Sequence, residues 1–306
     1  GKSGKSGRTN EDGYDVQLEL ELNEDEAPDA PNRCSEPRLF AIQRDRARAQ
    51  IGSLLARRDY RALEAIGDQL PPDILPLIRH LAARNDLQTE EAYKLARTLS
   101  LPFKLYPAKR AAGEEYRELS EYYLLLRNLQ LTGRYSEFVL RLNPFLTHLM
   151  ARQVEMSLPE GAEDVIERRT DGWIKFRADV LRRKLPAEAD ELDRRCAAYV
   201  TDSELSLFVG VRLLRILGRL PEHVLCTLEA CKSLNNVQRN PTAHQLHAVT
   251  DEDIKRACVD GNQKAYGADE LIRIFGGMLE KAYPEVCDKE LFTVYDRCGD
   301  HISQRL

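Results

Sequence analysis

Residues 113–133, which read GEEYRELSEYYLLLRNLQLTG, decide the fold class of this chain. Their apolar side chains recur every three or four residues, which is the period of a helix that buries one face. Gly133 ends the pattern, because glycine readily takes the left-handed backbone conformation that closes a helix. The stretch therefore predicts an amphipathic helix over residues 111–132.

The same helical period governs the chain from Leu39 to the C-terminus, and Pro71-Pro72 interrupts it early. No β-rich region competes with the predicted helices, and the loops between them are short. Such a pattern is typical of an all-α multi-helix bundle. Besides the helix at 111–132, the period predicts helical segments over 39–60, 59–70, 73–84, 89–99, 135–156, 163–184, 187–199, 203–217, 221–235, 251–259, 267–282 and 287–305.

The first 38 residues have a different character. Residues 1–13 are glycine, serine and charged residues and are expected to be flexible. Residues 14–22, YDVQLELEL, alternate apolar and polar side chains, which predicts an isolated β-strand. Residues 23–37 hold three prolines and five acids and are predicted to form an acidic linker. We therefore expect an N-terminal segment over 1–38 and one helical domain over 39–306.

Composition excludes several classes of protein. Hydrophobic residues make up 42% of the chain and charged residues 31%, as in a globular protein with a strongly charged surface. No apolar run is long enough for a membrane helix, and no signal-peptide pattern is present. The seven cysteines form no CxxC pair, which argues against a zinc site or a disulfide scaffold. We expect a cytoplasmic protein without a metal or a membrane partner.

Residues 235–247, NNVQRNPTAHQLH, contain the candidate site. Asn235-Asn236 are expected to end one helix. Asn240-Pro241 are expected to begin the next, since asparagine is a favoured cap and proline a favoured first helical residue. His244 then lies about one turn into the new helix, and Arg239 stands just before its cap.

This arrangement suits a phosphate. The start of a helix presents unpaired amides and partial positive charge, which also favours a neutral imidazole and a lowered pKa at His244. The planar guanidinium of Arg239 matches phosphate oxygens. No Asp or Glu occurs from Ala230 to Thr250 in a chain with 50 such residues. The residues alone leave two interpretations open, a phosphate site or an ordinary capped and solvated loop.

The stretch RNPTAH, residues 239–244, resembles the Arg-x4–6-His motif of HEPN ribonucleases, including the polar residue after the arginine. The segments VTDEDIKRA, ADELIRIFGGMLEKAY and ELFTVYDRCGDHISQRL look like the C-terminal part of type III-A CRISPR-associated ribonucleases of the Csm family, and RRDYRALEAI resembles the entry into their helical domain. The resemblance covers residues 40–306 and is strongest over 230–306.

This resemblance implies an endoribonuclease of type III CRISPR antiviral defence. It would cut single-stranded RNA without a metal, in a cleft that two copies of the HEPN domain form together as a homodimer. Arg239 would stabilise the scissile phosphate, and His244 would act as general acid or base during attack of the ribose 2′-hydroxyl. Asn240 would hold the helix start, and the products would carry 2′,3′-cyclic phosphates.

The family normally carries a CARF sensor domain for cyclic oligoadenylate. Residues 1–38 are too short for that domain, and the strand at 14–22 is consistent with its last strand. We therefore expect the sensor to be truncated, excised or absent from this chain, and no cofactor to bind here. Two rival functions stay open: a HEPN toxin of a toxin–antitoxin pair, and a non-catalytic helical adaptor in which RNPTAH only caps a helix.

Three lesser features have a functional and an ordinary interpretation. His247 lies one turn after His244 and is either a further RNA contact or a surface residue. Trp173, among several cations, would stack on a base, although core or interface burial is the more ordinary role. A basic run would contact RNA phosphates or form the solvated face of a helix: Arg44, Arg46, Arg48, Arg57, Arg58 and Arg61.

Overall fold

The computed structural model describes the backbone of residues 36–106, 113–234 and 248–306, and side chains from residue 45 onward. By its contacts the chain divides into two units, 1–47 and 48–306. Helix α1, Glu36–Ala56, begins in the first unit and ends in the second. The predicted strand at 14–22 and almost all of the predicted linker lie outside the described residues. Because α1 begins at Glu36, the last two residues of that linker are helical instead, with Pro37 in the first turn where proline is tolerated.

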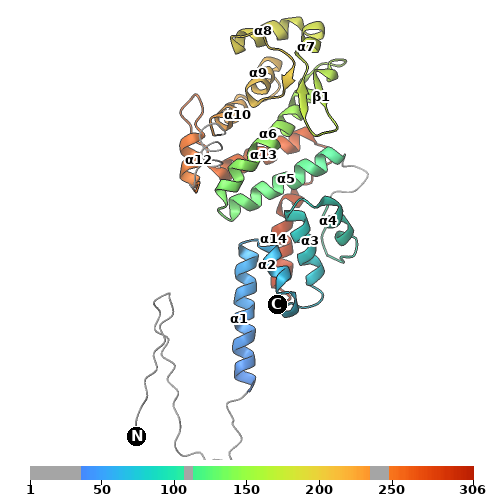
Figure 1. The fold of residues 1–306 in the computed structure, drawn as a ribbon, viewed down its shortest axis with the longest axis vertical. Helices are drawn as coiled ribbons and strands as arrows, with labels where there is room; N and C mark the ends of the chain where they lie inside the picture. Colours follow the sequence, from blue (N-terminus) through green and yellow to red (C-terminus); the bar gives the residue numbers. More distant parts are fainter. Residues whose placement is uncertain (1–35, 107–112, 235–247) are drawn as a thin grey trace, which may run out of the picture. The chain divides into compact units, whose positions relative to one another are not determined.

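Helices dominate the unit 48–306, as the sequence predicts (Figure 1). The predicted amphipathic stretch at 111–132 is helical over Glu114–Leu131, and the predicted helix at 267–282 over Ala268–Ala282. The helices of this unit after α1 are α2 Tyr60–Ala65, α3 Leu75–Asn85, α4 Thr89–Ala96, α5 Glu114–Leu131, α6 Tyr135–Ser157, α7 Ala178–Lys184, α8 Pro186–Cys196, α9 Leu207–Leu217, α10 Glu222–Leu234, α12 Asp251–Ala257, α13 Ala268–Ala282 and α14 Val294–Ser303, with short 3-10 turns η1 Gly67–Gln69, η2 Glu163–Val165 and η4 Lys289–Thr293.

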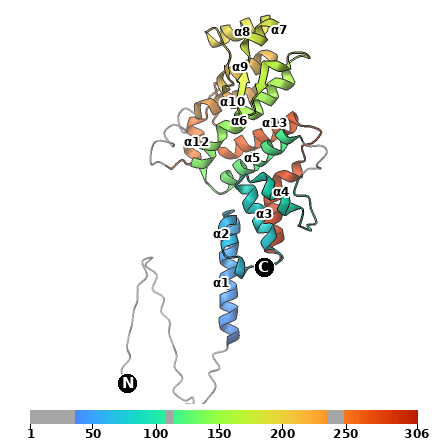
Figure 2. The same cartoon turned by 45° about the vertical axis from the view of Figure 1, so that its right-hand side comes forward.

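Helices α5, α6 and α13 form the centre of this unit, as both ribbon views show (Figures 1 and 2). Phe145 of α6 packs on Phe275 of α13 with ring centres 5.7 Å apart, and both rings are buried. Gln153 of α6 donates to the carbonyl of Met278 at 3.0 Å, so a polar group in this core also has its partner. The central helices therefore give the rest of the unit a rigid support.

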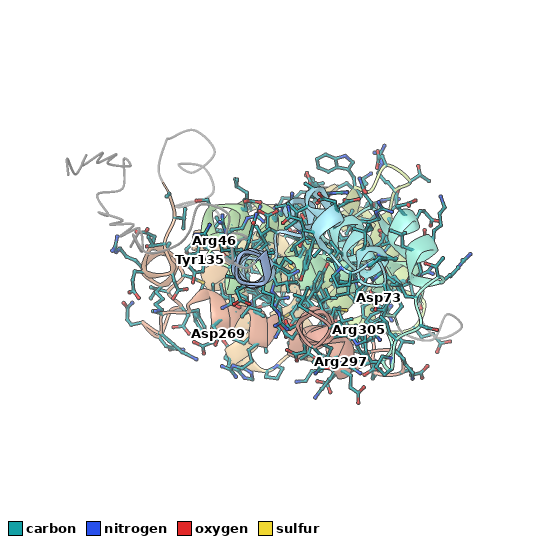
Figure 3. All side chains as sticks on the ribbon, turned by 90° about the horizontal axis from the view of Figure 1, so that it is seen from below. Arg46, Asp73, Tyr135, Asp269, Arg297 and Arg305 are labelled. Carbon is teal, nitrogen blue, oxygen red and sulfur yellow. The ribbon has the colours of Figure 1, made fainter. Side chains whose placement is uncertain are left out.

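Two groups of helices flank this centre. On one side, α2, α3 and α4 lie with α14, where Tyr60 stacks on Tyr295 at 5.7 Å. Arg305, just after α14, pairs with Asp73, just before α3 (Figure 3). On the other side, α7, α8, α9 and α10 follow one another in contact.

The prediction of an all-α fold is wrong in one region. The predicted helix at 163–184 is instead η2, a hairpin and α7, and the start of the predicted helix at 203–217 is a strand. Together they make a three-stranded antiparallel sheet of β1 Ile166–Arg168, β2 Ile174–Phe176 and β3 Ser203–Glu204, in which Ile166 pairs with Phe176 and Lys175 with Glu204.

The reason lies in the turn between β1 and β2. Gly172 has a φ of 84°, a backbone conformation that a helix interior does not allow. Asp171-Gly172 is a strong turn signal between residues with alternating burial, and the sequence reasoning overlooked it. Trp173 follows this turn with 55% of its surface exposed, so it is not a core residue of this unit, while an interface role and base stacking both stay predictions.

Candidate functional site

The predicted catalytic residues Arg239, Asn240 and His244 lie outside the described residues, and so does His247. What the structure describes is the frame on either side of residues 235–247. Helix α10 leads into the segment and ends at Leu234, whose side chain is fully buried. Residues 248–250 lead out of it into α12.

The C-terminal end of the segment is fixed to the central helices. The backbone N–H of Val249 donates to Oγ of Ser136 at 3.0 Å. Ser136 stands in the first turn of α6, next to Tyr135, and Val249 is 5% exposed. A buried N–H without a partner would cost free energy, so this bond ties the chain to one place on α6.

Helix α12 begins at once after this contact with a reciprocal cap. The hydroxyl of Thr250 accepts the N–H of Asp253 at 3.2 Å, while the carboxylate of Asp253 accepts the N–H of Thr250 at 3.0 Å. This capping box satisfies two donors that the first turn of a helix leaves free. Asp251 accepts the N–H of Ala268 at 2.9 Å and therefore caps α13 as well. The exit of the segment is thus joined to two helices.

The entry and exit of the segment come from helices in contact, since α10 packs on α12. Cys231 of α10 and Cys258, which ends α12, are both fully buried. A hydrogen bond between the two thiols, together with burial, raises the pKa of Cys231 well above its usual value. The Cys231 thiol is therefore neutral and poorly nucleophilic near pH 7, and it acts here as a packing group.

The acidic residues that follow the segment are engaged with neighbours. Lys255 lies 3.0 Å from Asp251 and 2.8 Å from Glu252, and these contacts raise its pKa. Asp253 is held in the capping box and lies 3.3 Å from Arg256. With no carboxylate between Ala230 and Thr250, an anion at the segment would meet little repulsion from this side.

The predicted basic run is already partly neutralised. Arg58 donates to Asn128 at 2.6 Å and pairs with Asp296, and Arg61 lies 2.8 Å from Asp86. Arg46, Arg48 and Arg57 are exposed, and the side chain of Arg44 lies outside the described residues. Arg58 and Arg61 therefore serve as links between helices in this structure, not as a free path for RNA.

Across residues 36–106, 113–234 and 248–306, no group of three or more His, Cys, Asp or Glu side chains is placed to hold a metal ion. Among the same residues, no helix has the length and apolarity needed to cross a membrane.

Sequence reasoning missed one cluster beside the entry of the segment. Phe208 of α9 has the guanidinium carbon of Arg212 3.6 Å from its ring centre and the Nζ of Lys232 4.1 Å from it. The local signal was the spacing of Phe208 and Arg212, four residues apart on one helix face. Lys232 comes from α10, and no local pattern could have placed it there.

Comparison with known proteins identifies relatives of this chain. The CRISPR system endoribonuclease Csm6 of Mycobacterium tuberculosis is 25% identical to this chain over an alignment of 308 residues. The alignment covers 98% of this chain. The chain spans 64% of the length of that relative. The fold is also similar to that of Enterococcus italicus Csm6 bound to cyclic hexa-2′-fluoro-hexa-dAMP, with a TM-score of 0.64 and 17% identity over 88% of this chain and 59% of that one.

A family model described as the Cas_Csm6 HEPN domain matches residues 105–303, which is about two thirds of the chain. The match begins just before α5 and ends with α14, so it takes in the three central helices and residues 235–247. The chain therefore belongs to the Csm6 HEPN family of CRISPR-associated proteins.

Proposed function

We propose that this protein is an endoribonuclease of type III CRISPR antiviral defence that cuts single-stranded RNA. One observation carries the proposal: the Csm6 HEPN match over residues 105–303 takes in the Arg239–His244 motif. The relative from Mycobacterium tuberculosis is named an endoribonuclease, which supports the same activity. Membership of the family favours this function over a HEPN toxin. We further propose a cytoplasmic homodimer in which two copies of the motif line one cleft.

The residue types of the motif suggest how the reaction proceeds. Arg239 would bind the scissile phosphate and stabilise the charge that builds on its oxygens in the transition state. His244 would take the proton from the attacking ribose 2′-hydroxyl or give one to the leaving 5′-oxygen. Asn240 would cap the helix that carries His244. Attack by the neighbouring 2′-oxygen breaks the bond to the 5′-oxygen and leaves a 2′,3′-cyclic phosphate and a 5′-hydroxyl.

The described frame supports this role for the segment. The described residues that flank 235–247 are held by buried contacts, at Leu234 and at Val249. Catalytic groups need such support, because small displacements from the reactive geometry reduce the rate strongly. We also propose that the reaction needs no metal or other cofactor.

The test compares Arg239→Ala and His244→Ala with the wild-type chain on a labelled single-stranded RNA in excess EDTA. Each substitution is expected to lower the cleavage rate by roughly 100-fold or more, since both residues act in the transition state. A matched control is His223→Ala, an exposed histidine of α10. Light scattering before the assay checks that the variants keep the assembly state of the wild type.

The outcomes separate the rival functions. Cleavage by both variants at the wild-type rate would reject the assignment of the site. If the wild-type chain itself leaves the RNA intact, the adaptor role gains support instead. Loss of wild-type cleavage in EDTA would contradict metal independence. Product ends that resist a cyclic phosphodiesterase and carry a 3′-hydroxyl would contradict attack by the 2′-hydroxyl.

A further inference from the structure

The cluster of Phe208, Arg212 and Lys232 brings two cations to one aromatic ring. Arg212 and Phe208 lie four residues apart on α9, and Lys232 stands in the last turn of α10. The guanidinium carbon lies 3.6 Å and the ammonium 4.1 Å from the ring centre. Both distances are within the range of favourable cation–π contact. All three side chains are half-buried, so the charged groups still reach solvent.

No carboxylate neutralises these charges. In the part of the chain that the structure describes, neither Arg212 nor Lys232 has an acidic partner within 4.0 Å. The nearby acids have other partners: Glu222 and Glu229 of α10 each lie 2.7 Å from Arg215. The residues after Lys232 cannot supply a partner, because Ala230–Thr250 holds no acid. Two like charges on one ring without a counter-ion are expected to attract an anion.

Arg212 is also held in a fixed orientation. Its Nε donates to the carbonyl of Arg195 at 3.0 Å, and its Nη1 donates to the carbonyl of Phe208 at 3.2 Å. These bonds and the ring face order the guanidinium before any ligand arrives. A group that is ordered beforehand loses less conformational entropy on binding. The cluster thus has the properties of a built anion site.

We infer that this cluster binds a backbone phosphate of the RNA strand that the Arg239–His244 motif cuts. The inference rests on the proposed function. Lys232 stands three residues before the start of the segment 235–247 and seven before Arg239, so the short chain between them keeps the cluster and the motif within reach of one RNA strand. Phosphate contacts of this kind position a strand without reading its bases. Phe208 serves as the platform that holds the two cations.

A purely structural role makes a different prediction. Arg212 bonds a carbonyl near the end of α8, and Lys232 complements the negative end of α10, so both could act on stability alone. In that case their removal would lower the free energy of unfolding and leave RNA affinity and its salt dependence unchanged. Measuring both quantities on the same variants distinguishes the two roles.

The experiment measures binding of a fluorescein-labelled 2′-O-methyl single-stranded RNA, which lacks the attacking hydroxyl, at several salt concentrations. The variants are Lys232→Gln, Arg212→Gln and the double substitution. Each lost phosphate contact is expected to lower the slope of log affinity against log salt by about 0.7 and to weaken binding roughly fivefold at 0.1 M salt. With cleavable RNA, the loss should fall on KM.

The matched control is Arg97→Gln. Arg97 is an exposed cation at the end of α4, which lies away from α9 and α10 in both ribbon views. It should leave affinity and salt slope at wild-type values. Phe208→Leu removes the platform and should weaken binding, and Phe208→Tyr should restore it.

The outcomes separate this inference from the proposed function. If the wild-type chain cuts RNA but the double variant keeps its KM and salt slope, the inference is wrong and the proposed function stands. A fall in kcat at unchanged KM also overturns it, because the cluster would then act on the catalytic segment. If the wild-type chain neither binds nor cuts RNA, both fail together.

Discussion

Val249 and Ser136 are 113 residues apart in the chain, yet the N–H of one lies 3.0 Å from the hydroxyl oxygen of the other. This bond connects the exit of the segment that holds Arg239 and His244 to the first turn of α6. Since α6 is one of the central helices, the residues that follow the segment are attached to the core of this unit.

Ser136→Ala is expected to lower the free energy of unfolding by about 1–3 kcal/mol, because the buried N–H of Val249 would lose its acceptor. Urea denaturation measures the loss. RNA cleavage should slow at the same time, because the end of the catalytic segment is released. Ser303→Ala is the control, since that hydroxyl donates to the carbonyl of Gly299 at an exposed site. Equal stability of both variants would show that the bond to Ser136 contributes nothing.

His80 is expected to make the protein acid-sensitive. Burial, with a smaller effect of the nearby Arg84 charge, lowers its pKa from 6.5 to about 4, while its Nδ1 lies 2.9 Å from the carbonyl of Ala92. Between pH 6.5 and 4, His80 is protonated in the unfolded chain and neutral in the folded chain. The free energy of unfolding therefore keeps its full contribution from His80 above pH 6.5. It decreases as the pH is lowered from 6.5 to 4, by about 3 kcal/mol in total.

The variant His80→Leu tests this account, since leucine has no proton to bind. Its free energy of unfolding, measured by urea titration, should depend on pH less steeply than that of the wild type. Between pH 6 and pH 5, the difference in slope should correspond to the uptake of about one proton on unfolding. Every other titrating group is shared by the two proteins and cancels in the comparison. Identical slopes would mean that His80 carries its charge in the folded state.

Arg84 and Glu121 form a buried pair that joins α3 to α5. Their side chains are 2% and 6% exposed, and two hydrogen bonds of 2.6 and 2.7 Å connect them. Arg84→Met alone is expected to cost about 3–5 kcal/mol, because Glu121 would be left as an unpaired buried charge. The double variant Arg84→Met with Glu121→Leu should recover much of that loss. Additive losses in the double-mutant cycle would contradict the coupling.

Gly210 lets α9 approach α6 closely. A Cβ at this position would overlap the sulfur and the terminal methyl carbon of Met150. Gly210→Ala should therefore lower the melting temperature, with an overpacking cost of about 1–3 kcal/mol. Gly277→Ala is the control, because a Cβ there meets no atom within 4 Å and alanine favours the helix. A Gly210→Ala variant as stable as that control would show that Met150 moves aside without cost.

The sequence predicts the bounds of a helix well where that helix is amphipathic and buries one of its faces. The predicted helix at 267–282 differs by a single residue from α13, Ala268–Ala282, because its apolar period and its N-terminal acids are local signals. The sheet was missed, because the turn signal at Asp171-Gly172 was overlooked and because its strands are only two or three residues long. Such strands hold only by pairing, and β2 pairs with β3 nearly thirty residues further on. No short stretch of sequence contains that information.

The sequence by itself determined the helical character of the chain and the residue types of the segment 235–247, because helix period, caps and residue types are local properties. Only the tertiary structure decided that Ser136 holds the exit of this segment, that Arg84 meets Glu121, and that Lys232 and Arg212 share the ring of Phe208. Apart from Arg212 and Phe208, the residues in contact lie far apart in the sequence. Their contacts depend on how apolar faces pack against one another, and a single stretch of sequence does not encode that packing.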